Sequence, residues 1–229
     1  MTSGTAATRA RAAPHARDLV KPRLRGVLHA WAAAVAVVSG IALVAVSPTP
    51  RVRLGSAVYA VVLVLLFATS AAYHRITWSP PAREWMKRLD HSTIFVFMAG
   101  THTVFCLAVL RGTELTVFLS LVWAGALAGI AARLLFLHAP RFLTVPLYLG
   151  LGWAAVVVSP QILHRAGVVS LVLLYVGGLF YTLGALAYAA RRPDPFPAVF
   201  GYHEVFHAAT IIAACCHYVA VTFAVRAAA

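Results

Sequence analysis

Long apolar runs dominate the sequence, and short polar or basic segments separate them. Each run is about 18 to 23 residues long, which is enough for a helix to cross a hydrocarbon core of about 30 Å. The pattern predicts seven membrane-spanning helices, at residues 27–46, 55–74, 92–110, 116–137, 142–159, 168–190 and 203–225. Pro146 interrupts the fifth run, but proline is tolerated inside membrane helices.

The connecting segments are short and leave no room for a separate soluble domain. We therefore expect an all-α membrane protein whose residues 26–229 form one seven-helix bundle. The composition agrees, because 62% of the residues are hydrophobic, only 11% are charged and the mean hydropathy is +0.85. We expect residues 1–25 to be a disordered basic cytoplasmic tail. Their composition also fits a mitochondrial transit peptide, but we favour the cytoplasmic tail because it also explains the charge distribution.

The formal net charge of +13 would suggest nucleic-acid binding in a soluble protein, but here its distribution matters more. If the runs cross alternately, most of the 19 Lys and Arg residues fall on the side of the N-terminus: Arg9, Arg11, Arg17, Lys21, Arg23, Arg25, Arg75, Arg83, Lys87, Arg88, Arg133, Arg141, Arg191 and Arg192. The other side carries Arg51, Arg53, Arg111, Arg165 and Arg226. The positive-inside rule then places the N-terminus in the cytoplasm and the C-terminus outside. We expect a multi-pass protein of the cell inner (plasma) membrane and no nucleic-acid partner.

Two histidines open the last apolar run, in the stretch GYHEVFHAAT that starts at Gly201. His203 and His207 are four residues apart, so on a helix their Cβ atoms lie about 5–6 Å apart on one face. That spacing suits two ligands of one metal ion, and zinc needs at least a third protein ligand. Polar residues inside a membrane are costly and are therefore candidates for function.

Two other segments bring polar side chains to the same depth. The second predicted helix runs inward and ends in FATSAAYH, with Ser70 and His74 on one face. The third begins on the inner side after MKRLDHSTIF, which places Asp90 at its inner end. The charge rule that set the topology used none of these residues. Their convergence is therefore independent support for a site near the cytoplasmic face.

His91 competes with Asp90 for a place in this site, but adjacent helical positions point about 100° apart, so both cannot face it. A carboxylate at the membrane boundary needs a cationic partner. The metal or its water supplies one, and an ion pair with Lys87 or Arg88 is the alternative.

The remaining histidines lack these properties. His102 and His217 lie about 18 Å and about 15 Å deeper at 1.5 Å per residue, and we expect them to form interhelical hydrogen bonds. His29 has the right depth but no partner at a helical spacing. The others are expected in the tail, in a loop and on the outer side: His15, His138 and His164.

The stretches SAAYH, LDHSTIF and YHEVFH, on the second, third and seventh predicted helices, resemble the progestin and adipoQ receptor family. The resemblance is closest to its bacterial hemolysin III branch, and it extends to KPRLRGVLHAW at the first helix. It implies a zinc ion near the cytoplasmic face. The implied ligands are His74, His203 and His207. Asp90 would hold the zinc-bound water, with Ser70 close by. The family is also similar to alkaline ceramidases, which implies zinc-assisted hydrolysis of a lipid amide.

Three functions stay open. The first is a zinc-dependent hydrolase of a lipid amide that serves membrane lipid homeostasis, with Asp90 as general base and then acid, and Ser70 as a hydrogen-bond donor. The second is a non-catalytic membrane sensor or homeostasis protein whose structural zinc is closed by a fourth ligand such as Asp90. The third is an intramembrane metalloprotease that uses HEVFH with Glu204 as base, which would make Glu204 essential and His74 dispensable.

The expected partners are membrane lipids, among them a lipid amide substrate. A protein hormone is not expected, because the tail is short and few residues follow Arg226. The branch name implies a cytolytic activity, but neither an inserting amphipathic helix nor a secretion signal provides a mechanism for it. The sequence does not predict an oligomeric state.

Overall fold

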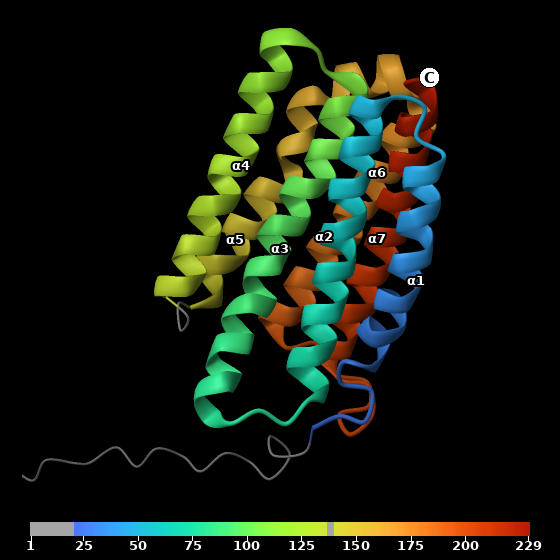
Figure 1. Cartoon of the computed structure of the whole chain (residues 1–229). Helices are drawn as coiled ribbons and strands as arrows, with labels where there is room; N and C mark the ends of the chain where they lie inside the picture. The colour runs from blue at the N-terminus through green and yellow to red at the C-terminus, as the bar shows by residue number, and fades with distance from the viewer. Residues whose placement is uncertain (1–20, 137–139) are drawn as a thin grey trace, which may run out of the picture.

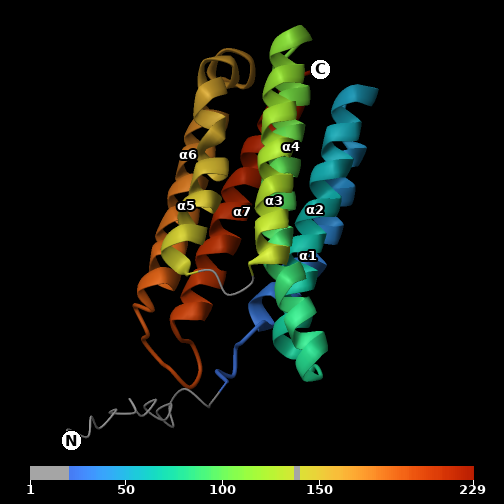
Figure 2. The ribbon, with the colours of Figure 1, turned by 90° about the vertical axis from the view of Figure 1, so that its left-hand side faces the viewer.

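The computed structural model describes residues 21–136 and 140–229, and this part of the chain is almost entirely helical. Its helices run up and down as one bundle (Figure 1). They are α1 Val27–Ala45, α2 Pro50–Arg75, α3 Pro80–Val109, α4 Gly112–Leu135, α5 Arg141–Gly152, the 3₁₀ helix η2 Trp153–Val158, α6 Ser159–Ala190 and α7 Tyr202–Ala227. The described residues contain no β-strand. Figure 2 shows α5 and α6 on one side of the bundle, α1 and α2 on the other, and α7 between them.

Six helices of the described part are long and apolar enough to cross a membrane. One of the six, counted from Thr144 to Ala190, is 47 residues long, or about 70 Å at 1.5 Å per residue, more than twice the hydrocarbon thickness. Gly167 breaks this segment with φ 83° and ψ 167°, and α5 packs beside α6. The expected all-α membrane protein is confirmed, while the number of crossings and the orientation of the termini stay predictions.

Proline and cap residues set where the helices begin. α2 starts at Pro50, and the Thr49 hydroxyl accepts a hydrogen bond of 3.3 Å from the amide of Val52, which satisfies one of the free N–H groups of the first turn. α3 starts at Pro80, where a missing N–H costs nothing. The predicted start of this helix at residue 92 is therefore wrong. Residues 80–91 are too polar to count as membrane-spanning but continue the helix, which projects beyond its neighbours at the lower end in Figure 1.

Arginines on the side that the sequence predicts to be the outer one have a structural role at the end of the bundle where α3 ends. The Arg165 guanidinium donates to the carbonyl oxygen of Val109 at 2.6 Å, and Arg51 donates to that of Leu110. These carbonyls end α3, where the last turn lacks partners and the helix dipole favours positive charge. Capping of α3 thus accounts for basic residues on this side.

Small residues let neighbouring helices approach closely. A Cβ at Gly184 on α6 would lie 2.9 Å from the Cβ of Ala209 on α7, and a Cβ at Gly40 on α1 would lie 2.7 Å from that of Ala60 on α2. Membrane helices associate through such close contacts because the hydrophobic effect does not draw them together in lipid. The pairs α1–α2 and α6–α7 are held in this way.

The starts of α1 and α7 and the end of α2 lie at the same end of the bundle (Figure 1). Backbone hydrogen bonds fasten the segment before α1 to the segment before α7, from Arg23 N to Ala198 O at 3.1 Å and from Leu24 N to Val199 O at 3.2 Å. Residues 1–20 of the predicted tail lie outside the described residues. This end of the bundle contains the candidate site.

Candidate metal centre

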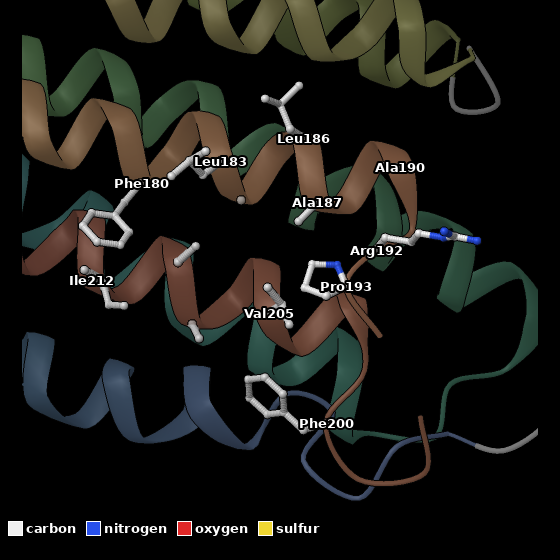
Figure 3. A pocket seen from close by; sticks show the side chains of 13 residues that line it. Phe180, Leu183, Leu186, Ala187, Ala190, Arg192, Pro193, Phe200, Val205 and Ile212 are labelled. Carbon is white, nitrogen blue, oxygen red and sulfur yellow. The ribbon is translucent and has the colours of Figure 1, made fainter. Parts of the chain in front are cut away.

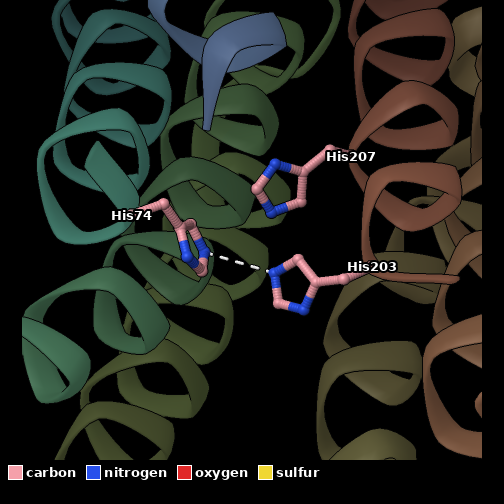
Figure 4. Close-up of side chains that lie close together, drawn as sticks. All are labelled: His74, His203 and His207. Carbon is pink, nitrogen blue, oxygen red and sulfur yellow. Dashed lines mark hydrogen bonds between the residues drawn. The ribbon is translucent and has the colours of Figure 1, made fainter. Parts of the chain in front are cut away.

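Three imidazoles meet where α2 ends and α7 begins (Figure 4). His74 lies in the last turn of α2, and His203 and His207 lie at the start of α7. The Nε2 atoms of His74 and His203 form a hydrogen bond of 3.2 Å. Each ring offers a nitrogen within 4.8 Å of the other two. Within the described part of the chain, this is the one group of His, Cys, Asp or Glu with that geometry.

The donor set fits zinc. Zinc binds imidazole nitrogens at about 2.0–2.1 Å with tetrahedral geometry, which places two ligand nitrogens about 3.4 Å apart. The observed 3.2 Å between the Nε2 atoms of His74 and His203 is close to that spacing. A set of three imidazoles also leaves the fourth tetrahedral position free, as at catalytic zinc sites.

The burial of the three rings points the same way. His74 is 8% exposed and His207 2%, while His203 is half-buried. Burying polar groups costs free energy unless each finds a partner. One metal ion would satisfy a nitrogen of all three rings at once.

Ser70 and Asp90 also come together, from α2 and α3. Ser70 lies one turn before His74, and its hydroxyl lies near the Asp90 carboxylate. The side chain of Asp90 is 14% exposed and lies 3.8 Å from Nδ1 of His91. Arg88, one of the alternative partners of Asp90, forms its ion pair with a glutamate of its own helix. Because Asp90 is not a member of the three-histidine group, we place it outside the ligand set. The catalytic roles of Asp90 and Ser70 stay predictions.

One residue at this end of the bundle had no role assigned from the sequence. His29, in the first turn of α1, is 3% exposed. Its Nδ1 lies 2.8 Å from Oγ of Ser70, and its ring stacks on that of His207 with centroids 3.9 Å apart and 5° between the planes. Its depth and the cost of a polar residue in a membrane helix were the signals available. A role for His29 could not be predicted from spacing along its own helix, because its partners lie on α2 and α7.

Glu204 is fully buried and engaged in structure. One carboxylate oxygen forms an ion pair with Arg25, and the other accepts a hydrogen bond of 2.9 Å from the amide of Gly201. An acid that accepts from the first N–H groups of a helix stabilises that helix. Glu204 therefore joins the segment before α1 to the start of α7, and each of its carboxylate oxygens already has a structural partner.

Gly26 allows α1 to begin against the end of α2. It has φ 77°, and a Cβ there would lie 2.7 Å from the Cβ of His74. Only glycine adopts this left-handed conformation without penalty and leaves this space. The backbone of Gly26 thus packs directly on a candidate metal ligand.

Comparison with known proteins agrees with these motifs. The sequence model of the family described as haemolysin-III related matches residues 17–218. The chain belongs to the haemolysin-III related family. It is similar to the "Hemolysin-3 homolog" of Bacillus subtilis (strain 168), with 30% identity over 150 residues, which are 66% of this chain and 67% of that protein. It is also similar to "Hemolysin-3" of Bacillus cereus, with 32% identity over 131 residues, 56% of this chain and 58% of that protein. The resemblance read from the three histidine-bearing stretches is confirmed.

Other histidines of this haemolysin-III related protein lie away from the centre. A carbonyl oxygen only accepts, so Nε2 of His217 donates to that of Leu174 on α6 at 3.1 Å, and the expected interhelical bond is present. For His102 the expectation is wrong, since its Nδ1 bonds the carbonyl oxygen of Met98 on the same helix at 2.7 Å. His15 and His138 lie outside the described residues, and His164 is exposed.

The protein also has an apolar groove between α6 and α7 (Figure 3). The groove has a volume of about 630 Å³, and Arg192 is the one charged residue in its lining. The α7 residues that line it are Val205, Ala208, Ala209 and Ile212. Positions 205 and 209 point about 200° away from positions 203 and 207. The groove therefore lies on the face of α7 opposite the histidines, at the same end of the bundle.

Proposed function

We propose that this protein is an integral membrane, zinc-dependent hydrolase of a lipid amide, acting at the cytoplasmic face of the cell inner membrane in lipid homeostasis. His74, His203 and His207 would hold the zinc. The observation that carries the proposal is the three-histidine group itself, whose ligand nitrogens lie within 4.8 Å of one another and which no other described His, Cys, Asp or Glu joins. A three-ligand set is typical of catalytic zinc, whereas structural zinc takes four protein ligands.

The residues around the triad support amide hydrolysis. When bound, zinc polarises a carbonyl and lowers the pKa of a bound water to about 7. Asp90 accepts a proton from the attacking water and passes it to the nitrogen of the leaving amine as the carbon–nitrogen bond breaks. Ser70 holds the carboxylate through its hydroxyl, and His29 holds Ser70 in turn. The steps convert one amide and one water into a carboxylic acid and an amine.

The setting supports a lipid substrate. The triad lies at one end of a bundle whose helices are long and apolar enough to cross a membrane, so a substrate anchored in the bilayer would present its polar end at that depth. The family resemblance to alkaline ceramidases favours an amide. The proposal also includes seven crossings with the N-terminus in the cytoplasm.

A structural zinc in a non-catalytic sensor is the second candidate. It is favoured by the way the site joins three helices, with His29 of α1 stacked on His207 of α7 and His74 contributed by α2. The protease alternative is not carried further, because both carboxylate oxygens of Glu204 are engaged.

An activity assay separates the two candidates. Detergent-purified full-length protein is stripped with a chelator, reloaded with zinc and incubated with a fluorescent fatty-acyl amide, beside Asp90→Asn prepared in the same way. Turnover that needs both zinc and Asp90 supports the hydrolase. Protein that zinc stabilises against heat but that cleaves no acyl amide would refute the hydrolase and favour the sensor.

A further inference from the structure

A second pair of buried histidines lies deep in the bundle, away from the candidate metal centre. His102 on α3 is 6% exposed and His217 on α7 is 7% exposed. His102 bonds the carbonyl oxygen of Met98 through Nδ1, and His217 bonds that of Leu174 through Nε2. A carbonyl oxygen only accepts, so these two nitrogens carry the ring protons.

The other nitrogen of each ring is therefore a lone-pair acceptor, since an unpaired imidazolium would be costly in this apolar setting. These acceptors are Nε2 of His102 and Nδ1 of His217. Both are buried, and neither has a hydrogen-bond partner among the described residues. An unsatisfied buried acceptor destabilises a fold, and most such groups in proteins have a partner.

Both histidines line the same small cavity. Its other lining residues come from several helices and are apolar apart from a threonine and a cysteine: Thr101, Phe105, Cys106, Phe118, Gly152, Ala155, Val158, Ile162 and Leu174. The cavity offers about 20 Å³ to the centre of a water molecule, and one water needs about 10–15 Å³ by that measure. An acyl chain or any larger organic ligand is too big for this space.

We propose that the cavity binds one water molecule, which donates one O–H to Nε2 of His102 and the other to Nδ1 of His217. A water has two protons, so it satisfies both acceptors at once. The bridge joins α3 to α7, and the bond from His217 to Leu174 extends it to α6. Water-mediated hydrogen bonds are nearly as favourable as direct ones, so the bridge stabilises the middle of the bundle.

Thermal unfolding of the full-length protein in detergent tests the bridge. His102→Phe, His217→Phe and the double variant keep ring-shaped side chains, which matters because the His217 ring packs directly on Gly177. Each single change leaves one acceptor without its water, whereas the double change removes both acceptors. We therefore expect the double variant to lower the unfolding midpoint by clearly less than the sum of the two single losses. Losses that simply add would overturn the proposal.

Ser170→Ala provides the matched control. Its hydroxyl is fully buried and donates to the carbonyl of Ala220 at 2.9 Å, and it does not line the cavity. Combined with His102→Phe, it should give losses that add. Non-additivity of the same size in this pair would mean that the coupling of the two histidines is not specific.

Two further measurements keep the proposal testable if a variant does not fold. In unmodified protein labelled with ¹⁵N-histidine, nuclear magnetic resonance should find the Nδ1–H form of His102 and the Nε2–H form of His217, each receiving magnetisation from water. The opposite tautomers, or no transfer from water, would overturn the bridge. A bound metal ion that is lost in His102→Phe but kept in His74→Ala would also overturn the water bridge.

Discussion

A single methyl group at Gly26 is expected to weaken zinc binding, although Gly26 is not a ligand. Gly26 has φ 77°, and a Cβ there would lie 2.7 Å from the Cβ of His74 and 3.1 Å from Cγ of Arg75. The left-handed conformation costs a residue other than glycine about 1–2 kcal/mol. The carbon–carbon contact of 2.7 Å adds to this cost, because one of the two backbones must move. His74 ends α2, so the movement displaces a candidate ligand.

The size of the effect follows from similar changes at metal sites. Loss of a hydrogen-bond partner that orients a metal ligand lowers metal affinity about 10–100-fold, and displacement of the ligand by a steric contact should have an effect of the same order. We expect Gly26→Ala to raise the zinc dissociation constant by a factor in that range. The assay is competition with a zinc-chelating dye, using detergent-purified protein at neutral pH.

Gly112→Ala is the matched control for this prediction. Gly112 has φ 56°, a Cβ there has no atom within 4 Å, and the residue begins α4 at the far end of the bundle (Figure 1). It carries the same kind of backbone strain without a contact near the histidines. Its zinc affinity should equal that of the wild type. Equal affinities of the two alanine variants would refute the argument that Gly26 positions His74.

Three further predictions concern residues around the triad. Asp90→Asn should keep its zinc and lose about 10²–10⁴-fold in kcat on a fatty-acyl amide, whereas loss of zinc would make Asp90 a ligand. His29→Phe keeps an aromatic ring stacked on His207 but removes the hydrogen bond to Ser70, so the zinc content should stay the same while kcat falls. His29→Leu also removes the stacked ring, so it should weaken zinc binding as well. Identical behaviour of the two variants would argue against a role for the stacking of His29 on His207. Glu204→Gln should lower the unfolding temperature and keep zinc and turnover; the cost should be below the roughly 3–5 kcal/mol of a fully buried pair, because Arg25 is 21% exposed. Loss of turnover without loss of stability would restore Glu204 as a catalytic base.

Two simple rules predicted that the histidines of the triad lie at one depth, and the family resemblance implied that they are the ligands. The charge distribution set the direction of each helix, and the spacing of His203 and His207 set their common face. Together they brought His74 to the same depth, and the structure places these three side chains within one group. Ser70 and Asp90 followed from the same depth argument and lie within reach of each other.

The rest depends on contacts that no local pattern contains. His29 finds its partners on α2 and α7, so nothing on its own helix marks it. The ion pair of Arg25 with Glu204 joins residues 179 positions apart, and the sequence motif around Glu204 suggested catalysis instead. The start of α3 at Pro80 was missed because a hydropathy pattern detects only the apolar part of a helix, and residues 80–91 are too polar to be detected in this way.

The most direct test of the central claim is the zinc content of three proteins by elemental analysis, after dialysis against a mild chelator. These are the wild type, His74→Ala and the control His164→Ala, whose side chain is exposed on α6. The account predicts about one zinc per chain in the wild type and in His164→Ala, and none in His74→Ala. A wild type without zinc, or a His74→Ala variant that keeps it, would contradict a metal centre shared by α2 and α7.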